Sequence, residues 1–489
     1  MFNKLLLNKK NNLFYIQSIL FILLPPLLIT GPFLSDLAVS IIAIFFLITL
    51  FKKKELNFLN NNLFKVFLIF WIYLILNSLL QNQNLDSLRI SFFHIRFGLF
   101  SFAIFYILKN EPKLLKYFFY SLLISMTALF IDGLIQFFFE KNLLGFELAS
   151  GPRVSSFFGD ELILGSYVAR LLPILTGIFI LIYMQSIKKN LIIFFSIFYL
   201  FLEALIFISG ERTAFFYFIL SSIFIFSLVS NFKRIGIFIA ALSIIFVILA
   251  LNLNPSLKDR MYKLTLTELD IQFPKIFLDF VMTKDDLNKD EINLTFGGLE
   301  EQLEIYNNLT LETVQRSYDL GLITESQKLI LEKKLKEKRK IIIFSEHHTE
   351  HFTSALKMVK DNLFFGVGVK NFRTKCKEPK YRVSDTSCST HPHNSYVQLL
   401  TETGLFGFIY FFSFFCFFLF YVYKHISLGF QKKVFLSNFE ICMLAAILIT
   451  LWPLAPTGNI FNNWLNIIFH IPVGFFLWSR KKGIKIINL

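Results

Sequence analysis

Long, nearly unbroken apolar runs recur along most of this 489-residue sequence. Each is about 15 to 24 residues long, and a helix needs about 20 residues to cross the hydrocarbon core of a bilayer. Hydrophobic residues make up 55% of the chain and charged residues only 17%. A soluble protein of this size needs more polar surface, so the pattern predicts an all-α polytopic membrane protein.

We expect about twelve transmembrane helices. The first apolar run is followed by Ser35-Asp36 and a second run, which favours a first transmembrane helix over a cleaved signal peptide. The expected spans lie near residues 13–33, 37–51, 63–80, 90–108, 117–138, 162–184, 191–208, 213–230, 235–252, 404–423, 438–454 and 460–478.

Basic residues mark every second connecting segment. They are Lys4, Lys9 and Lys10, then 52–54, Lys113 and Lys116, Lys188 and Lys189, Lys233 and Arg234, Lys432 and Lys433, and 480–482. Cytoplasmic loops carry this excess of Lys and Arg, so an even number of spans puts both termini in the cytoplasm. The net charge of +15 therefore reports membrane topology, and we expect membrane lipids and no nucleic acid as partners.

One large loop between the ninth and tenth spans falls on the opposite, periplasmic side. It divides the chain into an N-terminal membrane region (1–252), the loop (253–403) and a C-terminal membrane region (404–489). Its first part, to about residue 345, reads as a solvated helical insertion in which we find no chemistry. Its second part contains His347, His348 and His351, a Gly366-Val367-Gly368 turn, and two cysteines.

Cys376 and Cys388 lie twelve residues apart in this loop. In an oxidising compartment they favour a disulfide that closes a short loop, with two free thiols as the alternative. A Cys/His metal site is disfavoured because the sequence has no paired CxxC spacing. Cys416 and Cys442 fall in apolar spans and read as apolar packing residues.

Four arginines gather at one depth in the outer half of the membrane. Arg96 and Arg170 lie about six and eight residues inside spans that enter from outside, roughly 9–12 Å deep. Arg153 and Arg212 stand at outer span ends, where interfacial snorkelling is the simpler explanation. For Arg96 and Arg170 the simpler explanation is pairing with Asp132, Asp160 or Glu161. The functional interpretation is an anion site for a lipid pyrophosphate, which guanidinium binds bidentately.

The best-marked chemical motif is His391-Pro392-His393-Asn394, where the large loop re-enters the membrane. We expect Thr390 to cap a helix over 392–403 that stops at Gly404. His393 would then lie in the first turn, on one face with Tyr396, Val397 and Leu400. The positive helix end favours the neutral imidazole that a general base requires.

Other roles for these histidines stay open. His393 can instead be a structural residue that caps the loop. A metal pair with His391 is disfavoured, because no carboxylate ligand lies nearby in the sequence. Of the three earlier histidines, His351 is the best candidate for a supporting position, and Arg373 is as consistent with the protein surface as with the site.

The motifs together resemble those of O-antigen ligases and related polymerases of surface polysaccharides. His393-Asn394 followed after nine residues by Gly404 resembles the family's histidine motif. Ser209-Gly210-Glu211-Arg212-Thr213 and the segment 153–159 resemble its two arginine segments, and 358–372 resembles the loop before the histidine. The resemblance covers roughly 130–425, except for a polar insertion at about 265–340 that has no counterpart we can assign.

The resemblance implies an inverting, metal-independent glycosyltransferase at the periplasmic face of the bacterial inner membrane, with no cofactor. Its donor would be a glycan on undecaprenyl pyrophosphate and its acceptor a lipid A–core sugar or another glycan. His393 would activate the acceptor hydroxyl, while Arg212 and Arg153 would hold the pyrophosphate. Arg96 and Arg170 are added to the predicted pyrophosphate site because of their depth in the membrane, not because of the resemblance. We expect His391, Asn394, His351 and Arg373 to surround these groups.

The acceptor is not determined by these motifs, because a ligase, a polymerase and a protein O-oligosaccharyltransferase share donor and mechanism. A transporter is the competing class. It is disfavoured because the sequence lacks repeated halves and carries its intramembrane charges in the outer half rather than at mid-membrane.

Overall fold

The computed structural model describes residues 12–81, 85–149, 152–183, 189–229, 233–253, 255–263 and 346–482, together with residues 265, 315, 318, 325, 328 and 329. Throughout these residues the chain is helical, with two isolated bridges and no extended strand, which confirms the all-α prediction. The chain forms two compact units. One contains Met1–Phe246 and Glu346–Leu489, and the other contains Val247–Ser345.

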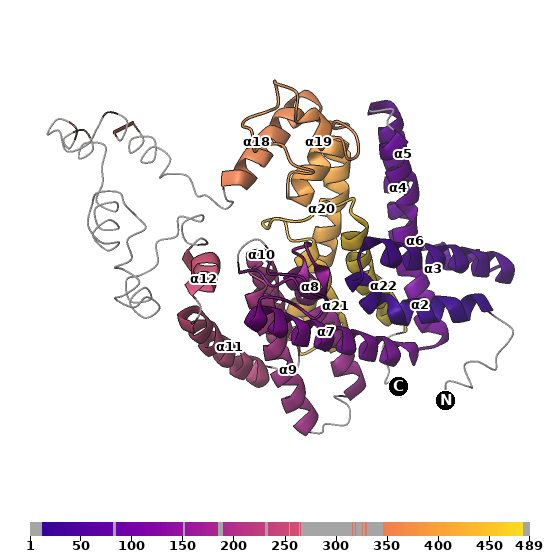
Figure 1. Ribbon diagram of the computed structural model, residues 1–489. Helices are drawn as coiled ribbons and strands as arrows, with labels where there is room; N and C mark the ends of the chain where they lie inside the picture. The colour runs from indigo at the N-terminus through magenta and orange to yellow at the C-terminus, as the bar shows by residue number, and fades with distance from the viewer. Residues whose placement is uncertain are drawn as a thin grey trace. The chain divides into compact units, whose positions relative to one another are not determined.

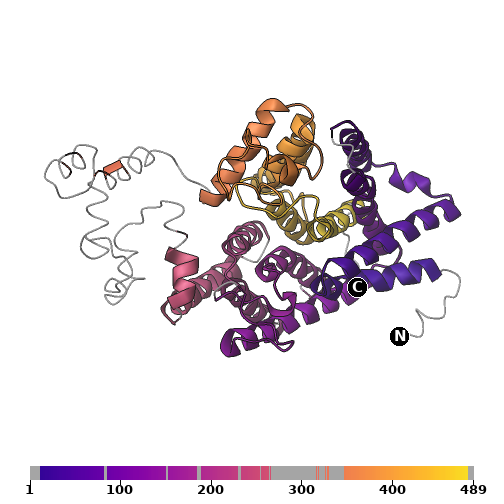
Figure 2. The same cartoon turned by 45° about the horizontal axis from the view of Figure 1, so that its top comes forward.

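The first unit is a bundle of long helices (Figures 1 and 2). Its helices are α2 (Asn12–Ile29), α3 (Pro32–Lys53), α4 (Asn62–Gln81), α5 (Leu85–Phe93), α6 (Ile95–Asn110), α7 (Leu114–Phe139), α8 (Leu164–Tyr183), α9 (Lys189–Ile208), α10 (Arg212–Leu228), α18 (Glu346–Asp361), α19 (Phe372–Lys375), α20 (Ser395–Phe430), α21 (Asn438–Thr450) and α22 (Asn463–Lys482). Helix α11 (Lys233–Leu253) crosses the boundary between the units.

Nine helical segments in the described part of the chain are long and apolar enough to cross a membrane. Eight of them are α2, α3, α4, α7, α8, α9, α11 and α20, and the ninth is the joined pair α5–α6. The other three expected spans correspond to α10, α21 and α22. Of these, α10 and α21 are apolar but only 17 and 13 residues long. Membrane-spanning helices are confirmed, and the total of twelve stays a prediction.

Apolar side chains cover the outside of these helices as well as their packed faces. On α4, Phe67, Phe70 and Leu74 are buried in the bundle. On the opposite face Ile69 and Ile72 are at least half exposed. A helix that is apolar all round is stable only where its outer face meets hydrocarbon, so this surface is suited to lipid.

Several basic connecting segments meet at one end of the bundle. Lys53 donates to the hydroxyl of Tyr106, and Lys109 and Lys481 both lie over the ring of Phe58. Connections that lack basic clusters contact one another elsewhere: Val154 pairs with Ile208, and Tyr217 with Pro456. Each set thus makes contacts within itself, and the sidedness that the charge pattern predicts stays a prediction.

Helix α20 carries a break at Gly404, where φ is 65° and ψ is −164°. The sequence predicts that the helix stops here. The backbone does leave the helical conformation at Gly404, and a second helical segment of α20 continues from this kink to Phe430. The N–H of Leu405 donates to the carbonyl of Leu363 instead of to that of Thr401, and three successive carbonyls at the break have partners outside the helix.

Those carbonyls fasten the segment before the histidine motif onto α20. The oxygens of Thr401 and Glu402 accept from the N–H groups of Val367 and Gly368, at 2.8 and 2.9 Å. The oxygen of Thr403 accepts from the hydroxyl of Tyr73 on α4, at 2.6 Å. Because no Cβ fits against Phe364 at the bend, only glycine allows this approach at position 404.

A small core forms beneath the histidine motif, where α18 and α19 pack against the start of α20 (Figure 1). Ala355 and Met358 of α18 meet Phe372, Cys376 and Tyr381 in a buried cluster, with Val397 of α20 against it. The periplasmic location of this segment and the predicted division at 253 and 403 stay predictions.

Few residues of the second unit are described. They include α12 (Pro255–Lys258) and the π-helical turn Asp259–Lys263. The expected polar insertion at about 265–340 lies outside the described residues apart from six single positions.

Gly404→Ala tests the bend. We expect a loss of about 2 kcal/mol in the free energy of unfolding, because alanine is strained at this positive φ and its Cβ meets the backbone of Phe364. The measurement is the thermal unfolding midpoint of the purified protein in detergent. Gly429→Ala, in the same helix with open space around it, is the matched control and should unfold no earlier than the parent. Equal midpoints for the two variants would contradict this account.

Candidate active site

Three histidine rings surround that of His393. Its centroid lies 4.2 Å from His391, 5.1 Å from His351 and 5.5 Å from His348. His348 and His351 belong to α18, and His351 therefore lies beside the motif in the supporting position that the sequence predicts. No group of three or more His, Cys, Asp or Glu that could hold a metal ion occurs in the part of the chain described.

The helix that follows the motif begins later than the sequence predicts. Its N-cap is Asn394, whose side-chain oxygen accepts from the N–H groups of Tyr396 and Val397, at 2.9 and 3.1 Å. The predictions that Thr390 is the cap and that His393 lies in the first turn and shares a helix face are therefore wrong. Both residues qualify as caps by type, and asparagine has the additional partners described next.

The loop between α21 and α22 holds the motif in place. Asn394 Nδ2 donates to the carbonyl of Pro453 at 2.8 Å, and the hydroxyls of Ser395 and Thr457 lie 2.8 Å apart. The N–H of Thr457 donates to the carbonyl of His393, also at 2.8 Å. That bond accompanies a left-handed backbone at His393, with φ of 55°. A non-glycine residue in this region is uncommon and is found where surrounding contacts enforce it.

Hydrogen bonding distinguishes the two histidines of the motif. His391 is buried and uses both ring nitrogens: Nδ1 lies 2.9 Å from the hydroxyl of Thr390, and Nε2 lies 3.2 Å from the carbonyl of Thr457. Because a carbonyl only accepts, Nε2 carries the proton. The ring of His393 is partly exposed and has no hydrogen bond to any described residue. Its nitrogens are thus available to a substrate hydroxyl, whereas those of His391 are not.

Burial keeps His393 neutral. Desolvation is the main cause that lowers its pKa to about 3, and the neighbouring imidazoles of His391, His348 and His351 act in the same direction. The pKa of His391 falls to about 4, again chiefly through burial, with smaller effects from His351 and Arg373. A neutral His393 was expected from a helix end. The cause in the structure is instead an apolar, histidine-rich surrounding.

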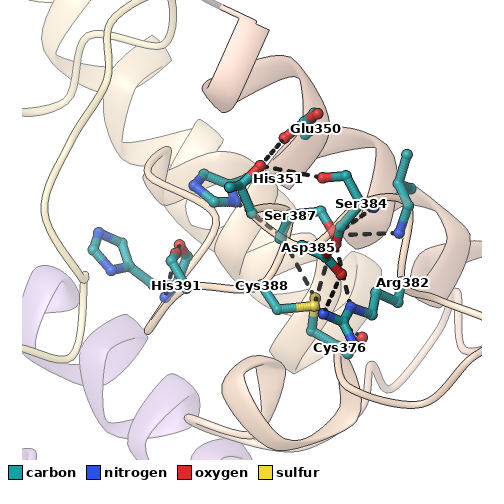
Figure 3. The surroundings of a disulfide bond; sticks show 12 residues. Glu350, His351, Cys376, Arg382, Ser384, Asp385, Ser387, Cys388 and His391 are labelled. Atoms are coloured by element: carbon teal, nitrogen blue, oxygen red, sulfur yellow. Dashed lines mark hydrogen bonds and ion pairs between the residues drawn. A yellow bond between two sulfur atoms is a disulfide. The ribbon is translucent and has the colours of Figure 1, made fainter.

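A disulfide joins Cys376 and Cys388, with a Cα–Cα distance of 5.6 Å (Figure 3). Beside it the carbonyl of Ser387 lies 2.8 Å from Nδ1 of His351. That ring nitrogen must donate, and this bond fixes the ring that stacks on His393. The disulfide loop therefore orients one wall of the histidine cluster.

Arg153 lies in a loop that two polar side chains of α7 hold. Gln136 accepts from the N–H groups of Ser155 and Ser156, at 2.9 and 2.6 Å. Asp132 accepts from the hydroxyl of Ser156 at 2.6 Å. Asp132 was considered as an ion-pair partner for Arg96 or Arg170, and that alternative is wrong because its oxygens hold this loop. Nε of Arg153 is buried and has no partner among the described residues.

Arg170 and Arg212 belong to the same group as Arg153. Glu211, the N-cap residue of α10, accepts from the N–H groups of Gly165 and Ser166 at 2.6 and 3.1 Å, which ties the start of α10 to the start of α8. Burial raises the pKa of Glu211, and the charge of Arg153 opposes that shift. Arg170 lies over the ring of Tyr217 at 4.6 Å, and its buried Nε has no described partner.

The side chain of Tyr217 and the loop at 453–457 connect this arginine group to the histidine motif. The hydroxyl of Tyr217 donates to the carbonyl of Pro456 at 3.2 Å, and the next residue, Thr457, bonds to His391 and His393. Two buried guanidinium donors without described partners, linked through Tyr217 and this loop to an uncommitted imidazole, form an arrangement suited to an anionic substrate.

Arg96 has different surroundings. It pairs with Asp36 at the start of α3, at 2.8 Å, and donates to Asn463 at 2.9 Å. It lines a cavity of about 660 Å³ together with Arg373 and Lys370. Arg96 therefore forms an ion pair, as the simpler explanation predicts, but its partner is Asp36 rather than Asp132, Asp160 or Glu161.

The loop over 453–457 was not predicted to belong to the site. The sequence indicates only an outer connection there, although Pro453 and Pro456 are the available signal for a rigid turn. Tyr217 was not predicted either, because its position one helical turn and a half after Arg212 gives no hint of contact with Arg170.

Comparison with known families identifies the segment that carries the histidines. Residues 346–412 match the model of the family described as O-antigen ligase, so this part of the chain carries that family's domain and the predicted resemblance is confirmed. The family supports glycan transfer of the ligase or polymerase type in general. No curated protein matched the chain.

Diethyl pyrocarbonate, which acylates neutral imidazole, tests the protonation state of His393. With a pKa near 3, its modification rate at pH 5.5 should equal the rate at pH 7.5, after correction for reagent decay. An ordinary histidine would slow about tenfold over that interval. Mass spectrometry of the peptide containing 391–394 gives the rate, with His393→Gln to assign the site and unfolded protein as the control. A tenfold decrease in the folded protein would contradict the shift.

Proposed function

We propose that this chain, whose residues 346–412 carry an O-antigen ligase domain, transfers a glycan from undecaprenyl pyrophosphate to an acceptor hydroxyl. The observation that carries the proposal is the partly exposed, neutral His393, uncommitted among the described residues and linked through one loop to buried arginines with unused donors. Together they supply a base and an anion site, the two requirements of this reaction.

Arg153, Arg170 and Arg212 hold the pyrophosphate of the donor in this proposal. Two of them keep a buried Nε without a described partner, and such donors are costly unless a ligand satisfies them. Guanidinium stays charged in a low dielectric and binds phosphate oxygens bidentately. Its charge would stabilise the leaving group, so we propose that transfer is metal-independent.

His393 takes the proton of the acceptor hydroxyl. The hydroxyl oxygen attacks the anomeric carbon of the donor sugar, a C–O bond forms there, and the bond from that carbon to the pyrophosphate oxygen breaks. The electron pair of the broken bond stays on the pyrophosphate. A single displacement of this kind inverts the configuration at the anomeric carbon. His391 cannot take the proton without giving up its bonds to Thr390 and Thr457.

We further propose a multi-pass protein of the bacterial inner membrane with both termini in the cytoplasm and the histidine site facing the periplasm. The alternation of basic and non-basic connections along the sequence supports this orientation. So does the disulfide beside the site, since the periplasm is an oxidising compartment.

Ligation to lipid A–core is the proposed acceptor reaction. Polymerisation of repeat units, or transfer to a protein hydroxyl, uses the same donor and base and is the alternative. A transporter remains the less favoured class, because a donor site beside a general base serves no purpose in carriage across the membrane.

A deletion strain complemented with variants tests both the reaction and the base. Without the protein, long glycan should disappear from lipid A–core while polymerised lipid-linked glycan accumulates. Complementation with His393→Ala should reproduce the deletion, because no base remains. The measurements are electrophoresis of lipopolysaccharide and mass spectrometry of the lipid-linked pool, with membrane insertion checked by immunoblot.

The outcomes separate the alternatives. Accumulated single repeat units would indicate a polymerase, and unchanged surface glycan in His393→Ala would contradict the role of this histidine. His425→Ala is the matched control, since that histidine near the end of α20 belongs to neither the motif nor the arginine group. It should restore glycan to the parental level.

Arg170→Lys and Arg212→Lys test the pyrophosphate site. Lysine keeps the charge but not the bidentate geometry, so we expect kcat/KM for the donor to fall about 100-fold. The assay is transfer by purified protein in nanodiscs. Arg382→Lys, in a surface ion pair with Asp385, should leave the rate unchanged. Full activity in Arg170→Lys and Arg212→Lys would show that these arginines only pack or snorkel.

A further inference from the structure

The structure contains a second cationic site, the cavity of about 660 Å³ that Arg96 lines. Four cations and two carboxylates face it, which leaves a formal charge of +2. The cations are Arg89, Arg96, Lys370 and Arg373, and the carboxylates are Asp36 and Asp86. Phe93, Phe97 and Phe461 add an apolar wall. A cavity of this composition fits an amphipathic ligand with an anionic head.

The charges in this cavity are unevenly neutralised. Asp36 is occupied by Arg96, at 2.8 Å. The charge of Asp86 acts on Lys370, whose pKa is lowered by burial and by the neighbouring Arg373. Arg89 and Arg373 have no ion-pair partner among the described residues. Two cations are therefore left for a ligand.

The backbone that carries Lys370 and Arg373 is held on three sides. The carbonyl of Val369 accepts from the hydroxyl of Ser87 on α5, at 2.7 Å. Asn77 of α4 donates to Phe365 at 2.6 Å, and the carboxylate of Glu402 accepts from the N–H of Phe372 at 3.1 Å. Lys370 itself has a left-handed backbone, with φ of 55°. Because this segment is already fixed, it loses little conformational entropy when a ligand binds its cations.

This cavity and the three arginines proposed to bind pyrophosphate are connected to the histidines through different elements. Arg153, Arg170 and Arg212 reach the motif through α8, α10 and Tyr217. The cavity is lined by α3, α5, α6, residues 370–374, and Phe461 and Asn463 at the start of α22, and the charge of its Arg373 acts on the imidazole of His391. A transfer between two lipid-linked substrates needs two head-group sites that meet at one base.

We propose that this cavity binds the phosphate-bearing head group of the acceptor lipid, with Lys370, Arg373 and Arg89 as its ligands and Arg96 held by Asp36 as part of the wall. This inference rests on the proposed function. It also moves Arg96 from the pyrophosphate site, where depth alone had put it, to the acceptor side.

Binding measurements on the full chain in phosphatidylcholine nanodiscs test the assignment, with His393→Ala as the background so that no turnover occurs. The probes are fluorescent diphosphoryl lipid A, phosphatidylglycerol and undecaprenyl pyrophosphate. Lys370→Gln/Arg373→Gln should weaken diphosphoryl lipid A about tenfold or more, because each cation makes a charge-assisted contact. It should leave the Kd of undecaprenyl pyrophosphate unchanged.

Arg153→Gln/Arg170→Gln should show the opposite pattern, and Arg382→Gln should change neither Kd. Arg89→Gln, on the exposed face of α5, is the second variant if the double change fails to fold. Loss of undecaprenyl pyrophosphate binding in Lys370→Gln/Arg373→Gln would assign the cavity to the donor. Equal affinity for phosphatidylglycerol would reduce it to a contact with bilayer head groups. The two double variants can lose different lipids, as expected, while the parent protein transfers no glycan. That result would overturn the proposed function and support this site.

Discussion

The interruption of α20 at Gly404 is the constraint on which the site depends. An unbroken helix would satisfy the carbonyls of residues 401–403 internally. The bend gives them instead to Val367, Gly368 and Tyr73, so one helix holds both the histidine motif at its start and the cationic segment beside it. The spacing from Asn394 to Gly404 then has a physical meaning. It is the length of helix between the cap that fixes His393 and the break that docks the neighbouring segment.

Polar side chains inside the bundle serve mainly to place loops. Asp132 and Gln136 of α7 hold the loop of Arg153, and Glu211 ties two helix starts together. The oxygens of these side chains accept from backbone, amide and hydroxyl donors, and the charge of Glu211 also acts on Arg153 and Arg170. Arg96 has a carboxylate of its own in Asp36, whereas Arg153 and Arg170 keep donors that no described residue uses. That difference, rather than depth, distinguishes Arg96 from the two arginines whose donors are available to a ligand.

Much of this architecture was predictable from the sequence because hydrocarbon imposes a length and a composition on each helix. All twelve expected spans correspond to helices, and the histidine motif lies within the matched family domain at 346–412, whereas the roles of the arginine segments stay predictions. Contacts between distant segments were not predictable. Thr390 and Asn394 are equally good caps by residue type, and only the loop at 453–457 favours Asn394. The partner of Arg96 was missed for the same reason, since sequence gives depth along a helix but not which helix lies beside it.

The neutrality of His393 has a consequence that a helix-end explanation would not have. A helix dipole is a fixed property of the fold, whereas desolvation and repulsion from other imidazoles can be offset by a bound anion. A pyrophosphate held by Arg153, Arg170 and Arg212 would raise the pKa of His393 towards the range in which imidazole is an effective base. The base would then be weak in the empty protein and strong once the donor is bound. Such coupling would make activation of the acceptor hydroxyl conditional on the presence of the glycan that it attacks.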